Sequence, residues 1–154
     1  MSIWDKYRKE SKQTIVILSV IVLSVKLCKA DGIFTEIERQ EILDIVPHES
    51  EERLLLLKII KEAEVDEGLM IDDAKRIKEL LGRENKSFFE FIIANLVRLA
   101  KVDKMVYEEI QFIYCISAIF YVGVKVTSYV VVLASASSGF SPRYIDSPLS
   151  RLIF

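Results

Sequence analysis

The chain has 154 residues, of which 51% are hydrophobic, with a net charge of −2, five glycines and three prolines. This length suits one domain with a hydrophobic core, and the scarcity of Gly and Pro favours helices over a turn-rich β fold. Residues 31–80 carry seven basic and fifteen acidic side chains, a net charge of −8. This argues against nucleic acid as the main partner, because that binding needs clustered Lys and Arg.

A basic N-terminal segment, residues 1–12, precedes a strongly apolar stretch. Residues 11–30 predict a helix that is apolar nearly all round and therefore central in the fold. The stretch is short for a membrane span, and Lys26 and Lys29 interrupt it. We therefore expect a buried core helix here, with a membrane anchor as the alternative.

The next helix is predicted to follow a turn at Asp31-Gly32. Thr35 is the expected N-cap, and Glu38 stands three residues later as its partner in a capping box. The segment 47–50 then breaks this helix, and Ser50 is a candidate cap for the helix that follows. Further helices are expected at 51–64, 72–81, 86–101 and 107–121, with Gly82 closing the second of these.

No sequence pattern typical of a catalytic site is found. The chain has no Gly-rich phosphate loop, no Gly-x-Ser-x-Gly and no His-Glu-x-x-His, and its one histidine, His48, is expected on a surface loop. Cys28 and Cys115 lie in apolar runs far apart, which does not fit a zinc site and favours two buried thiols. We therefore expect no enzyme, no catalytic residues and no organic cofactor. Six aromatic side chains at helical spacing are interpreted as core: Phe88, Phe89, Phe91, Phe112, Tyr114 and Phe120.

The stretch ADGIFTEIE admits three interpretations. It is similar to the second half of an EF-hand calcium loop, but Leu27 and Lys29 stand where the first ligands should be, and neither binds calcium. It can be purely structural, with Asp31 accepting backbone hydrogen bonds and Gly32 at positive φ. The third interpretation is a family signature, because the pattern recurs.

The recurrence joins LCKADGIFTEIE to LAKVDKMVYEEI later in the chain, with Asp31 aligned to Asp103 and Asp66 near the midpoint. A helix, an Asp corner and another helix therefore repeat along the sequence. The two stretches resemble the TerB domain of tellurite resistance, which is shared with the N-terminal domain of the membrane-anchored co-chaperone DjlA. The family pattern is a helix ending in Ala-Asp-Gly, a short link with Ser or Thr, and a Glu-bearing helix. The residues that match its first copy are Ala30, Asp31, Gly32, Thr35 and Glu38.

The second copy matches less closely. Asp103 is retained, but Lys104 replaces Gly, Tyr107 replaces Ser or Thr, and Ile110 stands where Glu is expected, one residue after Glu109. The resemblance covers residues 13–120 and implies an all-α bundle of six or seven helices with a pseudo-two-fold repeat. It also implies a stress-linked, cytoplasmic role near the inner membrane face. The acidic residues that it suggests as ligands of a divalent metal ion are Asp31, Glu38, Asp103 and Glu109.

The tail, residues 121–154, departs from the family pattern. Lys125 is the one charged residue between 111 and 140, and a Ser- and Pro-rich end follows. Residues 111–134 could associate with a membrane or a partner. The tail could also pack as an extra helix or hairpin, or be an altered reading-frame end, and the Ser/Pro end is expected to be poorly ordered.

Two classes of function follow from these observations. The leading expectation is a non-enzymatic TerB-like adaptor or sensor domain that binds a protein partner and responds to a divalent metal ion. The alternative is a membrane-associated helical protein anchored by its hydrophobic N- or C-terminal segment.

Overall fold

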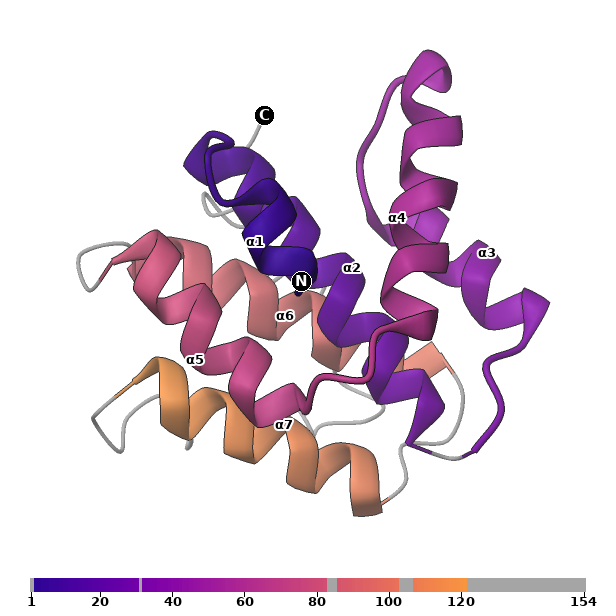
Figure 1. Cartoon of the computed structure of the whole chain (residues 1–154). Coiled ribbons are helices and arrows are strands. Elements are labelled where there is room, and N and C mark those ends of the chain that lie inside the picture. Colours follow the sequence, from indigo (N-terminus) through magenta and orange to yellow (C-terminus); the bar gives the residue numbers. More distant parts are fainter. Residues whose placement is uncertain (1, 31, 83–85, 103–106, 122–154) are drawn as a thin grey trace.

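The computed structural model describes residues 2–30, 32–82, 86–102 and 107–121 (Figure 1). This part of the chain folds into α-helices joined by short links, with one 3₁₀ turn and no strand, which confirms the predicted all-α bundle. The elements are α1 (Ile3–Tyr7), α2 (Lys12–Lys29), α3 (Glu36–Ile45), the 3₁₀ turn η1 (Ser50–Glu52), α4 (Arg53–Val65), α5 (Met70–Leu81), α6 (Lys86–Val102) and α7 (Tyr107–Phe120).

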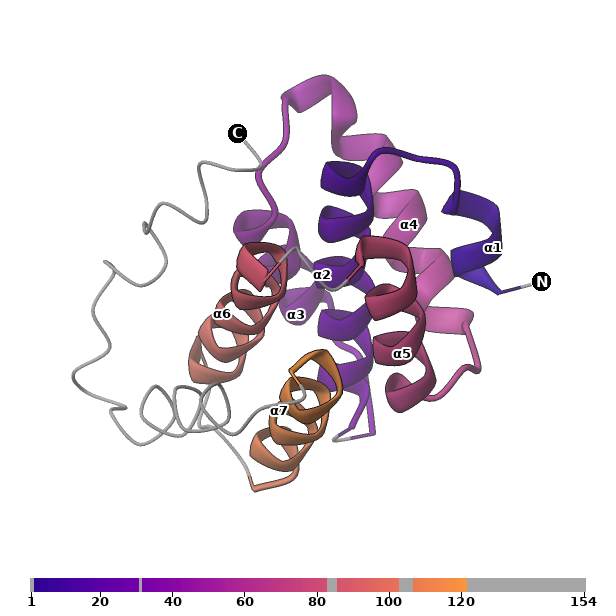
Figure 2. The same cartoon turned by 90° about the vertical axis from the view of Figure 1, so that its left-hand side faces the viewer.

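Helix α2 is the centre of the bundle. It packs against α3, α4, α5 and α6, and Figure 2 shows it enclosed by these helices. From Ile15 to Cys28 every side chain except that of Ile17 is buried. A helix with neighbours on all sides needs an apolar surface on all sides, so the expectation of a buried core helix is confirmed.

Several predicted helix ends are confirmed, and each is made by residues close in sequence. Thr35 Oγ1 accepts a hydrogen bond from the Glu38 amide at 3.2 Å, and the Glu38 carboxylate accepts one from the Thr35 amide at 2.9 Å. This is the expected capping box at the start of α3. Gly32 and Gly82 have φ values of +113° and +80°, which favour glycine, and Gly82 ends α5 as predicted.

The link between α3 and α4 differs from the prediction. Ser50 is not the N-cap of a helix, so that prediction is wrong. Glu49 occupies the cap position, where its amide donates to the Glu52 carboxylate at 2.9 Å, and Ser50 begins the 3₁₀ turn η1. This tighter turn delays the start of α4 to Arg53. Helix α5, in contrast, begins at Met70, two residues before the predicted Asp72.

Helix α1 lies within residues 1–12, a segment for which the sequence predicts a basic character but no helix. Ser2 and Asp5 form a capping box at its start, and Ile3 and Trp4 are buried, with Trp4 only 2% exposed. Helix α1 has five residues, which is too short for a hydrophobic period to reveal it. Its inclusion in the core depends on the Trp4 ring, whose burial removes a large apolar surface from water.

Two other groups of predicted core residues can be compared with the structure. Phe88, Phe89, Phe91 and Phe120 are buried as expected, and the two remaining aromatics, on α7, are half-buried. Cys28 is buried, but Cys115 is exposed, so the prediction of two buried thiols is wrong for the second. Both thiols are free. Cys115 lies on the outward side of α7, which an apolar sequence run alone does not reveal.

Candidate functional site

The predicted metal ligands are only partly within the described residues. Asp31 and Asp103 lie outside them. Glu38 is half-buried, and its Oε1 accepts hydrogen bonds from the Thr35 amide and hydroxyl at 2.9 and 3.0 Å. The structural role that the sequence suggests for Glu38 is therefore present.

Two of the predicted metal ligands, Glu38 and Glu109, affect the pKa of the Cys28 thiol. Burial raises the pKa of this thiol above its ordinary value, and the negative charge of Glu38, its hydrogen bond to the thiol and the charge of Glu109 raise it further. The charge of Glu41 also raises this pKa, so the thiol lies in acidic surroundings. Within the described residues, however, no group of three or more His, Cys, Asp and Glu side chains could hold a metal ion. The predicted metal site therefore depends on Asp31 and Asp103 and stays a prediction.

We expect calorimetric titration of the full chain with calcium, magnesium, manganese and zinc to show saturable binding of at least one ion. Carboxylate oxygens are the ligands that hard divalent cations prefer, so an Asp31→Asn, Asp103→Asn double variant should lose this binding. Absence of heat with all four ions, together with a lower melting temperature of the double variant, would mean that these aspartates only cap helices.

The described residues do assemble one buried charged cluster, around Lys26. This lysine projects from the last turn of α2 toward the link between α4 and α5. Its Nζ donates to Asp66 Oδ2 at 2.6 Å, to the Gly68 carbonyl oxygen at 2.7 Å and to Asp73 Oδ2. The Lys26 side chain is 8% exposed, that of Asp66 17% and that of Asp73 4%. We call Lys26, Asp66, Gly68 and Asp73 the Lys26 cluster.

Trp4 adds a fifth partner to this cluster. Its indole Nε1 donates to Asp73 Oδ1 at 2.8 Å, so each oxygen of the Asp73 carboxylate has a donor. The cluster therefore joins α1, α2, α5 and the α4–α5 link through one buried aspartate. Burial of charged groups is tolerated only where they are paired and hydrogen-bonded, and here the two carboxylates and the ammonium satisfy that condition.

The sequence contains weak signals for this cluster. Lys26 interrupts an otherwise apolar helix, and Asp66 falls near the midpoint of the repeat. Neither signal says that the two meet, because they are 40 positions apart and Asp73 is 47 positions from Lys26. A lone lysine within a buried helix is the feature that could have prompted a search for acidic partners, since Lys is almost never fully buried unless paired.

An open hollow of about 430 Å³ adjoins the Lys26 cluster. Apolar side chains of the α4–α5 link and α7, including Leu69 and Phe112, form part of its lining, and Glu67 adds an acidic group. Lys29 also lines the hollow, and its Nζ donates to the Glu64 carbonyl oxygen at 2.5 Å. The hollow gives solvent a path to the cluster.

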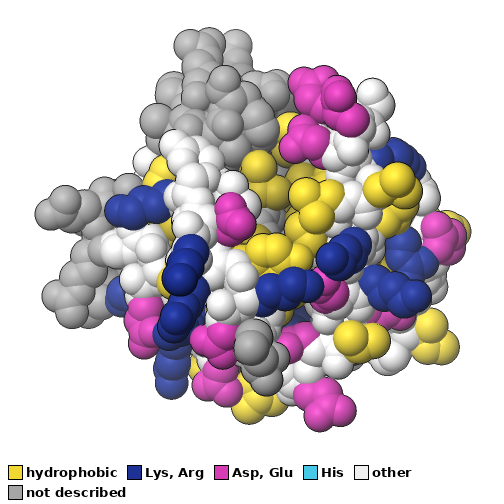
Figure 3. Space-filling model, turned by 45° about the horizontal axis from the view of Figure 1, so that its top comes forward, with side chains coloured by type: hydrophobic (Ala, Val, Ile, Leu, Met, Phe, Trp, Pro, Cys, Tyr) yellow, Lys and Arg dark blue, Asp and Glu magenta, His cyan; other side chains and the backbone are white. Residues whose placement is uncertain are grey.

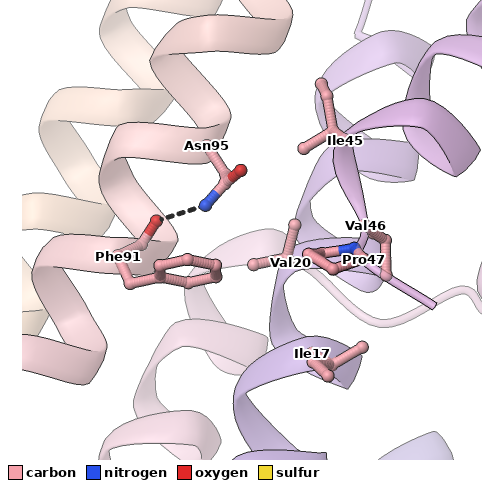
Figure 4. A pocket seen from close by; sticks show the side chains of 7 residues that line it. All are labelled: Ile17, Val20, Ile45, Val46, Pro47, Phe91 and Asn95. Carbon is pink, nitrogen blue, oxygen red and sulfur yellow. Dashed lines mark hydrogen bonds between the residues drawn. The ribbon is translucent and has the colours of Figure 1, made fainter. Parts of the chain in front are cut away.

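A second surface feature is an apolar crevice between α2, α3 and α6, which Figure 4 shows from close by. Its only polar lining side chain is Asn95, whose amide nitrogen donates to the Phe91 carbonyl oxygen at 2.8 Å within the same helix. The crevice leaves no room for a water molecule, so it is a packing seam and not a ligand pocket. The apolar side chains that line it are Ile17, Val20, Ile45, Val46, Pro47 and Phe91.

Exposed apolar side chains lie at the start of α4. Leu54 is 80% exposed and Leu55 is 51% exposed. Glu49, Glu51 and Glu52, in and beside η1, are exposed just before them in the chain. Figure 3 looks onto the end of the molecule where α2 and α4 begin, and it shows hydrophobic side chains gathered there with both acidic and basic side chains at their border.

The histidine lies in the link that follows α3, as the sequence predicts. His48 is half-buried there, and its Nδ1 is 2.7 Å from the Val46 carbonyl oxygen. This contact holds the ring against the backbone of its own link.

Among the described residues, no helix has both the length and the apolar character needed to cross a membrane. Of the segment 111–134, the part after Tyr121 lies outside the described residues. Comparisons of the chain with protein-family models, with curated proteins and with solved structures give no match. The resemblance to the TerB family therefore rests on the residues of the repeated Asp corner.

Proposed function

We propose that this chain is a non-enzymatic, TerB-like helical adaptor or sensor domain that binds a protein partner. The observation that supports this proposal is the pair of exposed leucines, Leu54 and Leu55, at the start of α4. Contact with a partner would remove their apolar surface from water, which stabilises a complex by roughly 25 cal/mol per Å². The stress-linked role, the cytoplasmic location at the inner membrane face and the metal response belong to this proposal through the family resemblance.

The net charge of the segment that contains the two leucines favours a basic partner. Glu49, Glu51 and Glu52 lie shortly before the leucines, Arg53 lies directly before Leu54, and residues 31–80 together have a net charge of −8. Complementary charge speeds association and selects against acidic partners. The partner that fits best is an amphipathic helix that presents leucine-like side chains to Leu54 and Leu55 and lysine or arginine to the glutamates.

Two synthetic helical peptides with the same apolar pattern test this docking surface. One carries lysine on its polar face and the other carries glutamate. We expect the full chain to bind the lysine peptide at least about tenfold more tightly, and a Leu54→Gln, Leu55→Gln variant to lose at least about tenfold of that affinity, which corresponds to 1.4 kcal/mol. Fluorescence anisotropy of labelled peptides measures both differences.

An Ile33→Gln, Val65→Gln variant is the matched control, because Ile33 is 78% exposed and Val65 is 72% exposed at other places on the molecule. Its affinity for the lysine peptide should equal that of the wild type. Equal binding of both peptides, or equal losses in the two variants, would contradict docking at the start of α4.

A further inference from the structure

The outward side of α7 carries no charged side chain over most of its length. Residues 110–121 contain no Asp, Glu, Lys or Arg, and the side chains exposed among them are Gln111, Cys115 and Ala118. A surface helix ordinarily bears charged residues on its solvent side, as α5 does with Asp72, Lys75 and Glu79. Helix α7 therefore has the composition of a helix with neighbours on both sides.

Helix α7 lies at the edge of the described bundle. It packs against α5 and α6, and Figure 1 shows it below α5, with no described helix on its lower side. Helix α2, which is also apolar nearly all round, is instead enclosed by four helices. A helix without a charged side is buried on all sides in a folded protein, so the outward side of α7 needs a cover.

The segment that follows α7 in the chain has the composition and the starting point of such a cover. Residues 122–134 lie outside the described residues, and Lys125 is the one charged residue among them. The Tyr121 hydroxyl donates to the Lys86 carbonyl oxygen at 3.2 Å, which holds the end of α7 against the start of α6. The segment therefore starts at one end of the uncharged side of α7.

The length of this segment also matches the surface. Residues 111–120 extend along α7 for about 15 Å, and residues 125–134 equal them in number and in helical length. The turn of a helical hairpin takes about two to five residues, and residues 122–124 supply it with Gly123 at its centre. Lys125 then stands beside the turn, where its ammonium group reaches water. An extended segment would leave its backbone groups unpaired, because the described part of the chain offers no strand.

We propose that the outward side of α7 is the docking surface for residues 125–134 of the same chain, which turn back and run antiparallel to α7. Attachment favours this occupant over a second copy, because a short link gives an effective concentration of roughly millimolar order. In this arrangement Val131 lies opposite Cys115, since each is eight positions from Gly123. The inference is independent of the docking surface on α4.

The reactivity of Cys115 tests the proposal, because its thiol is exposed among the described residues whereas that of Cys28 is buried. We expect Cys115 of full-length Val130→Asp, Val131→Asp to react with N-ethylmaleimide at least about tenfold faster than in the wild type, since carboxylates against an apolar helix release the segment. Cys28 should stay unreacted in both proteins, because burial raises its pKa, and so it reports an intact fold. Mass spectrometry of the digested protein distinguishes the two thiols.

Ser147→Asp, Ser150→Asp adds the same charge later in the tail and is the matched control, which should react at the wild-type rate. Equal rates of Cys115 in the wild type and in Val130→Asp, Val131→Asp would overturn the proposal. Protection that weakens when the protein is diluted would also overturn it, because a second copy is then the cover. Protection that requires added lipid vesicles would overturn it in favour of a membrane.

If Cys28 also reacts in the aspartate variant, that variant has unfolded, and full-length Val131→Cys replaces it. Mild oxidation with copper phenanthroline should then join the introduced thiol to Cys115 within one chain, which mass spectrometry detects. Ser147→Cys is the control for this experiment. Absence of the internal disulfide, or an equal yield from Ser147→Cys, would overturn the proposal.

Discussion

Replacing Lys26 by methionine should lower the free energy of unfolding by about 3–5 kcal/mol. Methionine keeps much of the length and apolar volume of the side chain but removes the ammonium group. The carboxylates of Asp66 and Asp73 would then face one another at 17% and 4% exposure without their shared cation. Urea denaturation followed by circular dichroism measures the loss, with the midpoint as the most direct readout.

Lys6→Met is the matched control for this experiment. Lys6 also pairs with a glutamate, since its Nζ is 2.7 Å from Glu62 Oε1, but its side chain is 47% exposed. A pair in contact with water contributes little, so this substitution should cost less than about 1 kcal/mol. Equal costs of the two substitutions would show that the Lys26 cluster does not stabilise the fold.

Replacing Phe89 by alanine should lower the free energy of unfolding by a similar amount, about 3–5 kcal/mol. Phe89 is 2% exposed on α6 and stacks on Phe120 of α7, with the ring centroids 4.8 Å apart. The edge of Tyr121 meets the same ring at 5.9 Å. Truncation removes these contacts and leaves a cavity between α6 and α7, which thermal and urea unfolding both detect.

Phe112→Ala serves as the comparison, because Phe112 is half-buried and lines the open hollow instead of the α6–α7 contact. Water can fill the space that its ring leaves, so its cost should be clearly smaller. A loss for Phe89→Ala no greater than that for Phe112→Ala would contradict the view that the Phe89–Phe120 contact joins the last two described helices.

The positions of the helices could largely be predicted from the sequence, because their causes are local. The apolar run of α2 indicates burial on all sides without knowledge of its neighbours. Thr35 and Glu38 form their capping box within three residues, and Gly82 ends α5 through its own backbone angle. The errors at Ser50 and in α1 arise where a short 3₁₀ turn and a five-residue helix are too brief to impose a period.

The residues of the candidate site could be predicted only in part. Glu38 was expected as a metal ligand, and its capping role is visible in the structure, whereas the metal role of Asp31 and Asp103 lies beyond the described residues. The exposure of Leu54 and Leu55 could not be predicted, because the run LLLLKII supplies both the buried and the exposed sides of α4. Which leucines face solvent depends on where α2 packs.

By itself, therefore, the sequence determined the helical class, the order of the helices and those of their ends that depend on neighbours along the chain. Only the tertiary structure decided that Lys26, Asp66, Asp73 and Trp4 share one buried cluster. The physical reason is that capping and helical periodicity act over three or four residues, whereas the cluster joins residues 40 to 69 positions apart. Such partners meet only after apolar burial has brought α1, α2 and α5 together.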